Sequence, residues 1–99
     1  MAYAIEIARS VVSQLAELTA NERARVLDAI DEQLGNEPLR ETRHRKPLRP
    51  NPVAPWELRV GALRVFYEAD AGPAKMVRVL AVGKKTGSVL KIAGREIKL

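Results

Sequence analysis

The chain has 99 residues, of which 46% are hydrophobic and 29% are charged, and its 17 basic against 12 acidic residues give a net charge of +5. This length predicts one domain spanning residues 1–99, and the absence of cysteine with a single histidine excludes disulfides, thiolate chemistry and histidine-rich metal sites. No apolar run approaches the roughly 20 residues of a membrane span, so we expect a cytoplasmic protein without a membrane partner.

The first predicted elements are a short strand and a helix. Apolar residues alternate with smaller or charged residues over 2–7, a period of two that predicts a strand. From Ala8 the apolar positions are three and four residues apart, which predicts a helix that ends near Leu18. Thr19 and Glu22 then have the spacing of a capping box, in which each side chain accepts from the other residue's backbone N–H.

A second helix is therefore expected to begin after Thr19. We expect its C-terminal end at Gly35, in a left-handed conformation, because Pro38 prevents the helix from continuing. Since almost no loop separates the two helices, they are expected to form an antiparallel hairpin.

Charge divides the chain into an acidic and a basic part. Residues 1–37 carry three basic and seven acidic side chains, whereas residues 38–99 carry fourteen basic and five acidic ones. Clustered lysine and arginine attract phosphate backbones, which predicts a polyanion-binding face in the second part. A solvated basic surface, or a site for an acidic protein, is the alternative.

The segment 36–55 is predicted to be a long loop. It holds five of the six prolines, interleaved with basic residues, and five fixed φ angles favour a stiff extended path with little regular structure. His44 lies in this loop. A lone histidine in a basic loop is more often solvated or in contact with nucleic acid than catalytic.

Antiparallel strands follow the loop. A hairpin turns at Gly61, a second turn runs from Asp70 to Pro73, and the basic segment 83–87 is expected to leave the sheet. The strands are expected over residues 56–60, 63–68, 76–82, 89–92 and 95–99.

This order predicts an α+β fold, in which an N-terminal strand and an antiparallel helical hairpin pack on one face of an antiparallel β-meander. Two arginines and an aromatic ring on the other, open face would suit phosphate contact and base stacking, whereas cross-strand charge pairing around a surface phenylalanine is the alternative. By alternation, Leu58, Val60, Val65 and Tyr67 point toward the helices, and Glu57, Arg59, Arg64, Phe66 and Glu68 point away.

One run of the sequence resembles a known family. The run Trp56–Glu68 reads WELRVGALRVFYE, RKPLR precedes it at 45–49, and VLAVGKK follows at 79–85. With these motifs the chain resembles, over nearly its whole length, the RelE/ParE toxin superfamily of bacterial type II toxin–antitoxin systems. The resemblance implies a toxin, associated with plasmid stabilisation, that a small cognate antitoxin neutralises. RelE-like members cut mRNA in the ribosomal A site and inhibit translation, whereas ParE-like members poison DNA gyrase.

The RelE-like alternative is an mRNA interferase, an endoribonuclease that uses no metal and no other cofactor. Such cleavage requires an activated 2′-hydroxyl, cations around the scissile phosphate, and a proton donor for the leaving oxygen. In that alternative Glu57 is either a base or a charge partner. The resemblance implies catalytic roles for Arg64, Arg59 and Lys84, and Glu57 is added to them although several relatives have a basic residue at its position. The basic loop, the open sheet face and the VGKK motif predict RNA contacts for Arg43, His44, Arg45, Lys46, Arg49, Phe66 and Lys85.

The chain departs from RelE-like nucleases near its C-terminal end. Many of these nucleases carry a tyrosine or histidine there, whereas residues 88–92 offer neither, and Tyr67 belongs to the core face. Two alternatives therefore stay open beside the interferase: a ParE-like toxin without nuclease activity, and an inactive binding module. The expected partners are an antitoxin together with mRNA on the ribosome, or with DNA gyrase in the ParE-like alternative.

Overall fold

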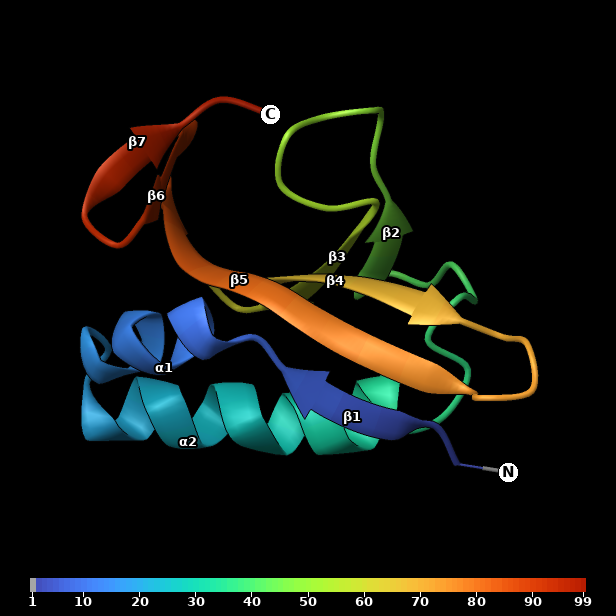
Figure 1. Ribbon diagram of the computed structural model, residues 1–99. Coiled ribbons are helices and arrows are strands. Elements are labelled where there is room, and N and C mark those ends of the chain that lie inside the picture. Colours follow the sequence, from blue (N-terminus) through green and yellow to red (C-terminus); the bar gives the residue numbers. More distant parts are fainter. Residues whose placement is uncertain (1) are drawn as a thin grey trace.

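Two helices lie on one side of a curved seven-stranded sheet (Figure 1). The computed structural model describes residues 2–99. In chain order its elements are β1 (Ala4–Ile7), α1 (Arg9–Ala16), α2 (Ala20–Ala29), the π-helical turn η1 (Ile30–Leu34), β2 (Arg45–Pro47), β3 (Trp56–Val60), β4 (Leu63–Asp70), β5 (Met76–Thr86), β6 (Val89–Ile92) and β7 (Arg95–Ile97).

The strands β2 to β7 form an antiparallel meander in sequence order, and β1 joins it by pairing in parallel with β5. Ala4 lies opposite Met76 and Ile7 opposite Val79. Strand β5 is therefore central, with β4 along one side and β1 followed by β6 along the other. The predicted α+β fold class is confirmed. The parallel pairing of β1 with β5 was not predicted from the sequence.

The helical hairpin begins as the sequence predicts and ends differently. The Glu22 backbone N–H donates to Thr19 Oγ1 at 3.1 Å, and the Thr19 N–H donates to Glu22 Oε1 at 3.0 Å, so the capping box is confirmed. The prediction of a left-handed conformation at Gly35 is wrong, because the φ angle of this residue is −69°. A glycine fits there for a different reason: a Cβ would lie 2.8 Å from the carbonyl oxygen of Asp31.

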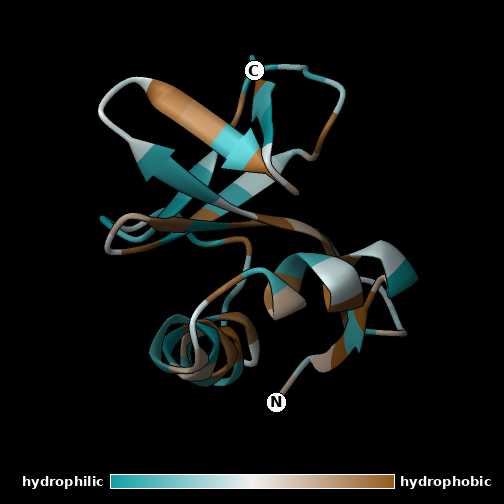
Figure 2. Ribbon diagram, turned by 90° about the vertical axis from the view of Figure 1, so that its left-hand side faces the viewer, coloured by the Kyte–Doolittle hydropathy of each residue, from teal (hydrophilic) through white to brown (hydrophobic). Residues whose placement is uncertain are grey.

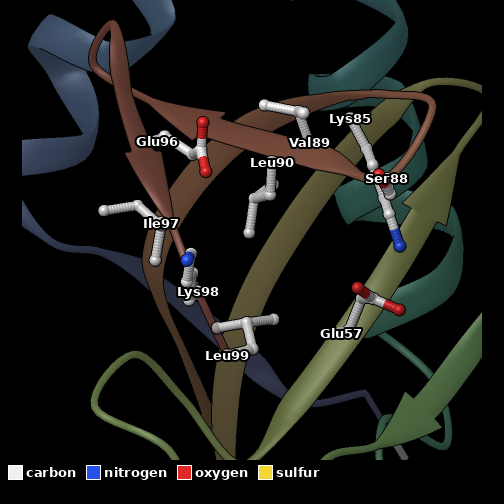
Figure 3. A pocket seen from close by; sticks show the side chains of 9 residues that line it. All are labelled: Glu57, Lys85, Ser88, Val89, Leu90, Glu96, Ile97, Lys98 and Leu99. Carbon is white, nitrogen blue, oxygen red and sulfur yellow. The ribbon is translucent and has the colours of Figure 1, made fainter.

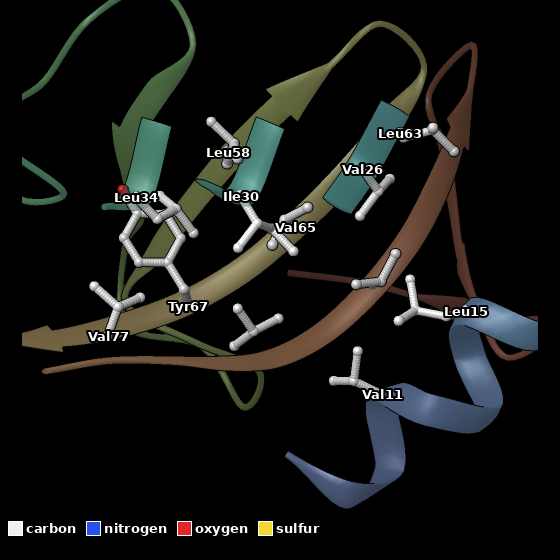
Figure 4. Close-up of a cluster of buried hydrophobic side chains, with 12 residues drawn as sticks. Val11, Leu15, Val26, Ile30, Leu34, Leu58, Leu63, Val65, Tyr67 and Val77 are labelled. Atoms are coloured by element: carbon white, nitrogen blue, oxygen red, sulfur yellow. The ribbon is translucent and has the colours of Figure 1, made fainter. Parts of the chain in front are cut away.

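The main core fills the space between the helices and the sheet (Figure 4). Figure 2 shows both helices on one side of the sheet, with hydrophobic residues (brown) along the helices and the strands. The apolar stripes of the two helices meet the helix-facing side of β3, β4 and β5, so the predicted alternation along β3 and β4 is confirmed for Leu58, Val65 and Tyr67. The buried members are Val11, Leu15, Val26, Ile30, Leu34, Leu58, Leu63, Val65, Tyr67, Val77, Val79 and Val82.

Strand β5 is longer than the sequence predicts, because the segment 83–86 stays in the sheet. Lys84 pairs with Lys91 of β6, and Lys85 pairs with Leu90. Gly83 allows this pairing to be close: a Cβ there would lie 2.5 Å from the Lys91 carbonyl oxygen. The β6–β7 hairpin consequently rises from the end of β5, on the side away from the helices (Figure 1).

The proline-rich segment is also more ordered than predicted. It contains β2, which pairs with β3, and a loop over residues 48–55 that is closed by the Leu48 N–H donating to the Pro55 carbonyl at 2.8 Å. The Asn51 amide organises this loop: its Nδ2 donates to two backbone carbonyls, and its Oδ1 accepts from two backbone N–H groups. Neither helix in residues 2–99 has the length and apolar character to cross a bilayer.

Candidate nucleic-acid interface

The sheet face opposite the helices collects basic side chains from four strands. The register places Lys46 opposite Glu57, Arg59 opposite Arg64, and Arg64 opposite Gly83. Because cross-strand partners and alternate residues share a face, Lys85 belongs to the same face as Gly83. We refer to Lys46, Arg59, Arg64 and Lys85, which surround Glu57, as the cationic face.

A carboxylate lies inside this face. The Glu57 side chain is only 7% exposed; its Oε2 accepts from Arg59 Nε at 3.0 Å, and its Oε1 lies 3.7 Å from Arg64 Nε. The Arg59 side chain remains 43% exposed, so its guanidinium can contact a ligand while it is paired. The structure thus brings together three of the four predicted catalytic residues.

Arg64 is held in place by the turn that precedes it. Its Nη1 donates to the carbonyl of Gly61 at 2.7 Å and to that of Leu63 at 2.9 Å, and the side chain is 12% exposed. Its Nε is buried and has no hydrogen-bond partner within residues 2–99. Burial lowers the pKa of Arg64, and the nearby Glu57 carboxylate opposes this effect. The guanidinium is therefore fixed in orientation and still has unused donor capacity.

Lys84 does not join the cationic face, which corrects its predicted catalytic position. It lies opposite Leu63, a core residue, and its Nζ forms an ion pair with Glu22 Oε2 of α2 at 2.9 Å. The pairing of β4 with β5 thus directs Lys84 toward the helices and its neighbour Lys85 away from them. Lys85, predicted as an RNA contact, is the lysine that the fold places beside Glu57.

A pocket of about 460 Å³ opens between β3 and the β6–β7 hairpin. Figure 3 shows the amino group of Lys85 pointing to the side of the pocket where Glu57 lies, with Ile97 and Leu99 on the opposite side. Ser88, Glu96 and Lys98 also line it, and none of these three was predicted as a site residue. Strand alternation could not have identified them, because the consecutive residues 96–99 all line the pocket.

Phe66 was expected on an open surface, and that expectation is wrong. The ring does point away from the helices, but it is 0% exposed, because Ala54, Ala81, Leu90 and Ile92 cover it in a second apolar cluster. The 48–55 loop and the β6–β7 hairpin supply part of this cover. Phe66 therefore supports the floor of the cationic face and presents no ring for stacking.

The basic residues around β2 separate into buried and exposed ones. Arg45 is buried: its Nη1 donates to the Gln33 carbonyl at 2.7 Å and its Nε to the Arg40 carbonyl at 3.0 Å, so it ties η1 to the sheet and does not face a ligand. This corrects its predicted RNA contact. Arg43, His44 and Arg49 are exposed, and the His44 carbonyl accepts from the Arg59 N–H at 2.8 Å, which places His44 beside the cationic face.

Within residues 2–99 no group of three or more histidine, cysteine, aspartate or glutamate side chains could hold a metal ion. The cationic face itself offers a ligand four cations and one carboxylate. Such a set can hold a phosphate and stabilise developing negative charge through fixed N–H donors.

The chain matches no protein-family model and no curated protein. Its fold is similar to that of solved structures, among them two chains from toxin–antitoxin complexes. A chain of the toxin–antitoxin complex RelBE2 from Mycobacterium tuberculosis is 26% identical, with 86% of this chain and 100% of that chain covered and a TM-score of 0.73. A chain of the archaeal RelE–RelB complex from Pyrococcus horikoshii is 26% identical, with 88% and 98% covered and a TM-score of 0.68.

Proposed function

Since this chain belongs to the RelE/ParE superfamily, we propose that it is the toxin of a type II toxin–antitoxin pair. Both similar structures are complexes of a toxin with its antitoxin, and the likeness extends over nearly the whole of each matched chain. Its partner is then a small cognate antitoxin. The basic second part of the chain favours an antitoxin segment with acidic side chains, because opposite charges speed and orient association.

We further propose that the toxin is a ribosome-dependent mRNA interferase that acts in the cytoplasm. The observation that carries this proposal is the pair Arg59 and Arg64, held around Glu57 on a face that also bears Lys46 and Lys85. Cleavage through the 2′-hydroxyl builds charge on the scissile phosphate, and fixed guanidinium donors stabilise that charge without reorganising. Arg64 is the most fixed of these donors because two backbone carbonyls hold its Nη1.

Induced expression tests the toxin proposal. Expression of the chain alone should stop growth, and co-expression of the antitoxin from the neighbouring reading frame should restore it. Translation should fall before DNA supercoiling changes. Normal growth at high soluble expression would contradict the toxin proposal, and early loss of supercoiling with intact mRNA would indicate gyrase as the target.

Substitution of Arg64 tests the interferase proposal. Removing one preorganised donor should lower the rate of ribosome-dependent mRNA cutting by roughly 100- to 1000-fold in Arg64→Ala. Arg64→Lys should recover only part of the rate, because an ammonium group cannot reproduce the guanidinium fork. The measurement is primer-extension mapping of a defined mRNA on purified ribosomes.

Arg78→Ala is the matched control for charge. Arg78 is half exposed and pairs with Glu6 and Glu68, toward the other end of the β4–β5 pairing from Arg64. The Arg78→Ala variant should cut mRNA at the wild-type rate. Because the Arg64 side chain is largely buried, antitoxin binding and circular dichroism must show that Arg64→Ala is folded. A folded Arg64→Ala variant that cuts at the wild-type rate would contradict the interferase assignment.

A further inference from the structure

The carboxylate of Glu57 is the anomalous group of the cationic face. A surface built to hold phosphate gains from every positive charge, yet this one carries a nearly buried negative charge between two arginines. The register also places Lys46 directly opposite Glu57, and Lys85 lines the same pocket as Glu57. The carboxylate thus occupies the position where the positive charges converge.

The geometry is poor for an ion pair whose purpose is stability. One hydrogen bond, from Arg59 Nε, holds the carboxylate, while Arg64 Nε stays 3.7 Å away and is buried without a hydrogen-bond partner in residues 2–99. Burying a carboxylate is unfavourable, and an ion pair offsets the lost hydration only when its geometry is good. An unpaired, buried N–H beside an anion indicates a donor that another anion could engage.

A carboxylate and a phosphate present the same acceptors to an arginine. Each offers paired anionic oxygens to a guanidinium fork. We propose that Glu57 is a positioning residue that acts as an internal substitute for the substrate phosphate. In the free protein its carboxylate keeps Arg59 oriented beside Arg64. When RNA binds, a backbone phosphate competes with the carboxylate for these two arginines.

This inference rests on the proposed function for the identity of its ligand, the RNA backbone. It predicts that removing the charge of Glu57 while keeping its shape strengthens RNA binding. Glu57→Gln should bind a single-stranded oligonucleotide about three- to fivefold more tightly, since a charge pair with one exposed partner, here Arg59, is worth up to about a factor of five in affinity. The salt dependence should steepen, by about 0.7 in the slope of log K against log salt for each additional phosphate that the protein neutralises.

The experiment measures binding of a fluorescent 2′-O-methyl uridine dodecamer by anisotropy at several salt concentrations, without ribosomes. The 2′-O-methyl group removes the nucleophile, so binding is measured without cleavage. Glu68→Gln is the matched control: it removes the same charge from a half-exposed carboxylate that pairs with Arg78 at 3.4 Å. We expect the control to bind within twofold of the wild type.

Equal binding by Glu57→Gln and wild type, or the same gain in both variants, would overturn the proposal. Should Glu57→Gln fail to fold, the Nε–Hε NMR signals of Arg59 and Arg64 in the wild type decide the matter. Both signals should move as the dodecamer is added, and signals that stay fixed at saturation would overturn the proposal. Wild-type protein that binds the dodecamer but leaves ribosomal mRNA intact would contradict the interferase alone.

Discussion

Tyr67 joins the loop after the helices to the core. Its side chain is fully buried, and its hydroxyl donates to the Pro38 carbonyl at 2.6 Å. Burial raises the pKa of Tyr67 well above its usual range, so the phenol stays protonated and remains a donor. The ring also contacts Trp56, with centroids 6.1 Å apart. These contacts make Tyr67 a structural residue, as its place on the core face predicts.

Removing the Tyr67 hydroxyl should therefore change stability and not activity. Tyr67→Phe leaves the Pro38 carbonyl without its donor, and an unsatisfied buried group costs about 1 to 3 kcal/mol of unfolding free energy. Urea denaturation measures this loss. Tyr3→Phe is the control, with an expected change within about 0.5 kcal/mol. Equal stability of the two variants would show that the hydroxyl bond contributes nothing.

Residue identity predicted part of the site, and strand pairing decided the rest. Alternation alone put Glu57, Arg59 and Arg64 on one face, because all three lie on a hairpin whose turn the sequence marks. Alternation could not predict which face of the sheet Lys84 lies on. That face depends on which residue of β5 lies opposite Leu63, and a shift of one residue in this register would exchange Lys84 with Lys85.

At the scale of elements, the approach of β6 to β5 depends on Gly83. A Cβ on this residue would lie 2.5 Å from the Lys91 carbonyl oxygen and 2.8 Å from Ile92 Cγ1. Since β6 and β7 form one wall of the pocket, this close approach fixes the width of the candidate site.

Gly83→Ala should force β6 away from β5. We expect a loss of about 1 to 3 kcal/mol of stability, typical of overpacking, and faster amide hydrogen exchange confined to β6 and β7. Hydrogen exchange followed by mass spectrometry measures the second effect. Gly72→Ala is the control, because its Cβ would meet only the Asp70 carboxylate, at 3.0 Å, which can move. Uniform exchange rates in Gly83→Ala would contradict this role.

Elements with local signals were predictable, whereas those made by distant contacts were not. The capping box at Thr19 and the turn at Gly61 lie within a few residues of the structure they specify. In contrast, β2 forms only because β3 offers it a partner, and the order of the 48–55 loop depends on the Asn51 side chain bonding to its own backbone. The cover over Phe66 was missed for the same reason.

For the whole molecule, the ion pair of Lys84 with Glu22 links the helical layer to the sheet. The hydrogen bond from Lys84 is the main cause that lowers the pKa of Glu22 below its ordinary 4.5, followed by the backbone N–H of Thr19. A lowered folded-state pKa means that this contribution to stability is present above pH 4.5 and disappears as pH falls through the folded value.

Lys84→Ala should therefore lower the melting temperature slightly at neutral pH, and the difference from wild type should vanish in acid. The capping hydrogen bond from Thr19 remains in both proteins, so the difference isolates the contribution of Lys84. Melting curves from pH 7 to pH 3 measure it. Lys91→Ala, at the cross-strand neighbour, is the control and should show no such pH dependence. A difference that persists at pH 3 would contradict the assignment.

The parallel pairing of β1 with β5 has a consequence for how the chain is made. Residues 4–7 pair with residues 76–79, so during synthesis the first strand has no partner until β2, β3 and β4 have been translated. The helical hairpin can form early from local contacts, but closing so long a loop comes late and slows folding. Strand β5, the late partner of β1, also carries Lys85 to the cationic face and covers part of Phe66. A nascent chain that has not reached β5 therefore has no complete site, and the proposed activity begins only after β5 has been synthesised.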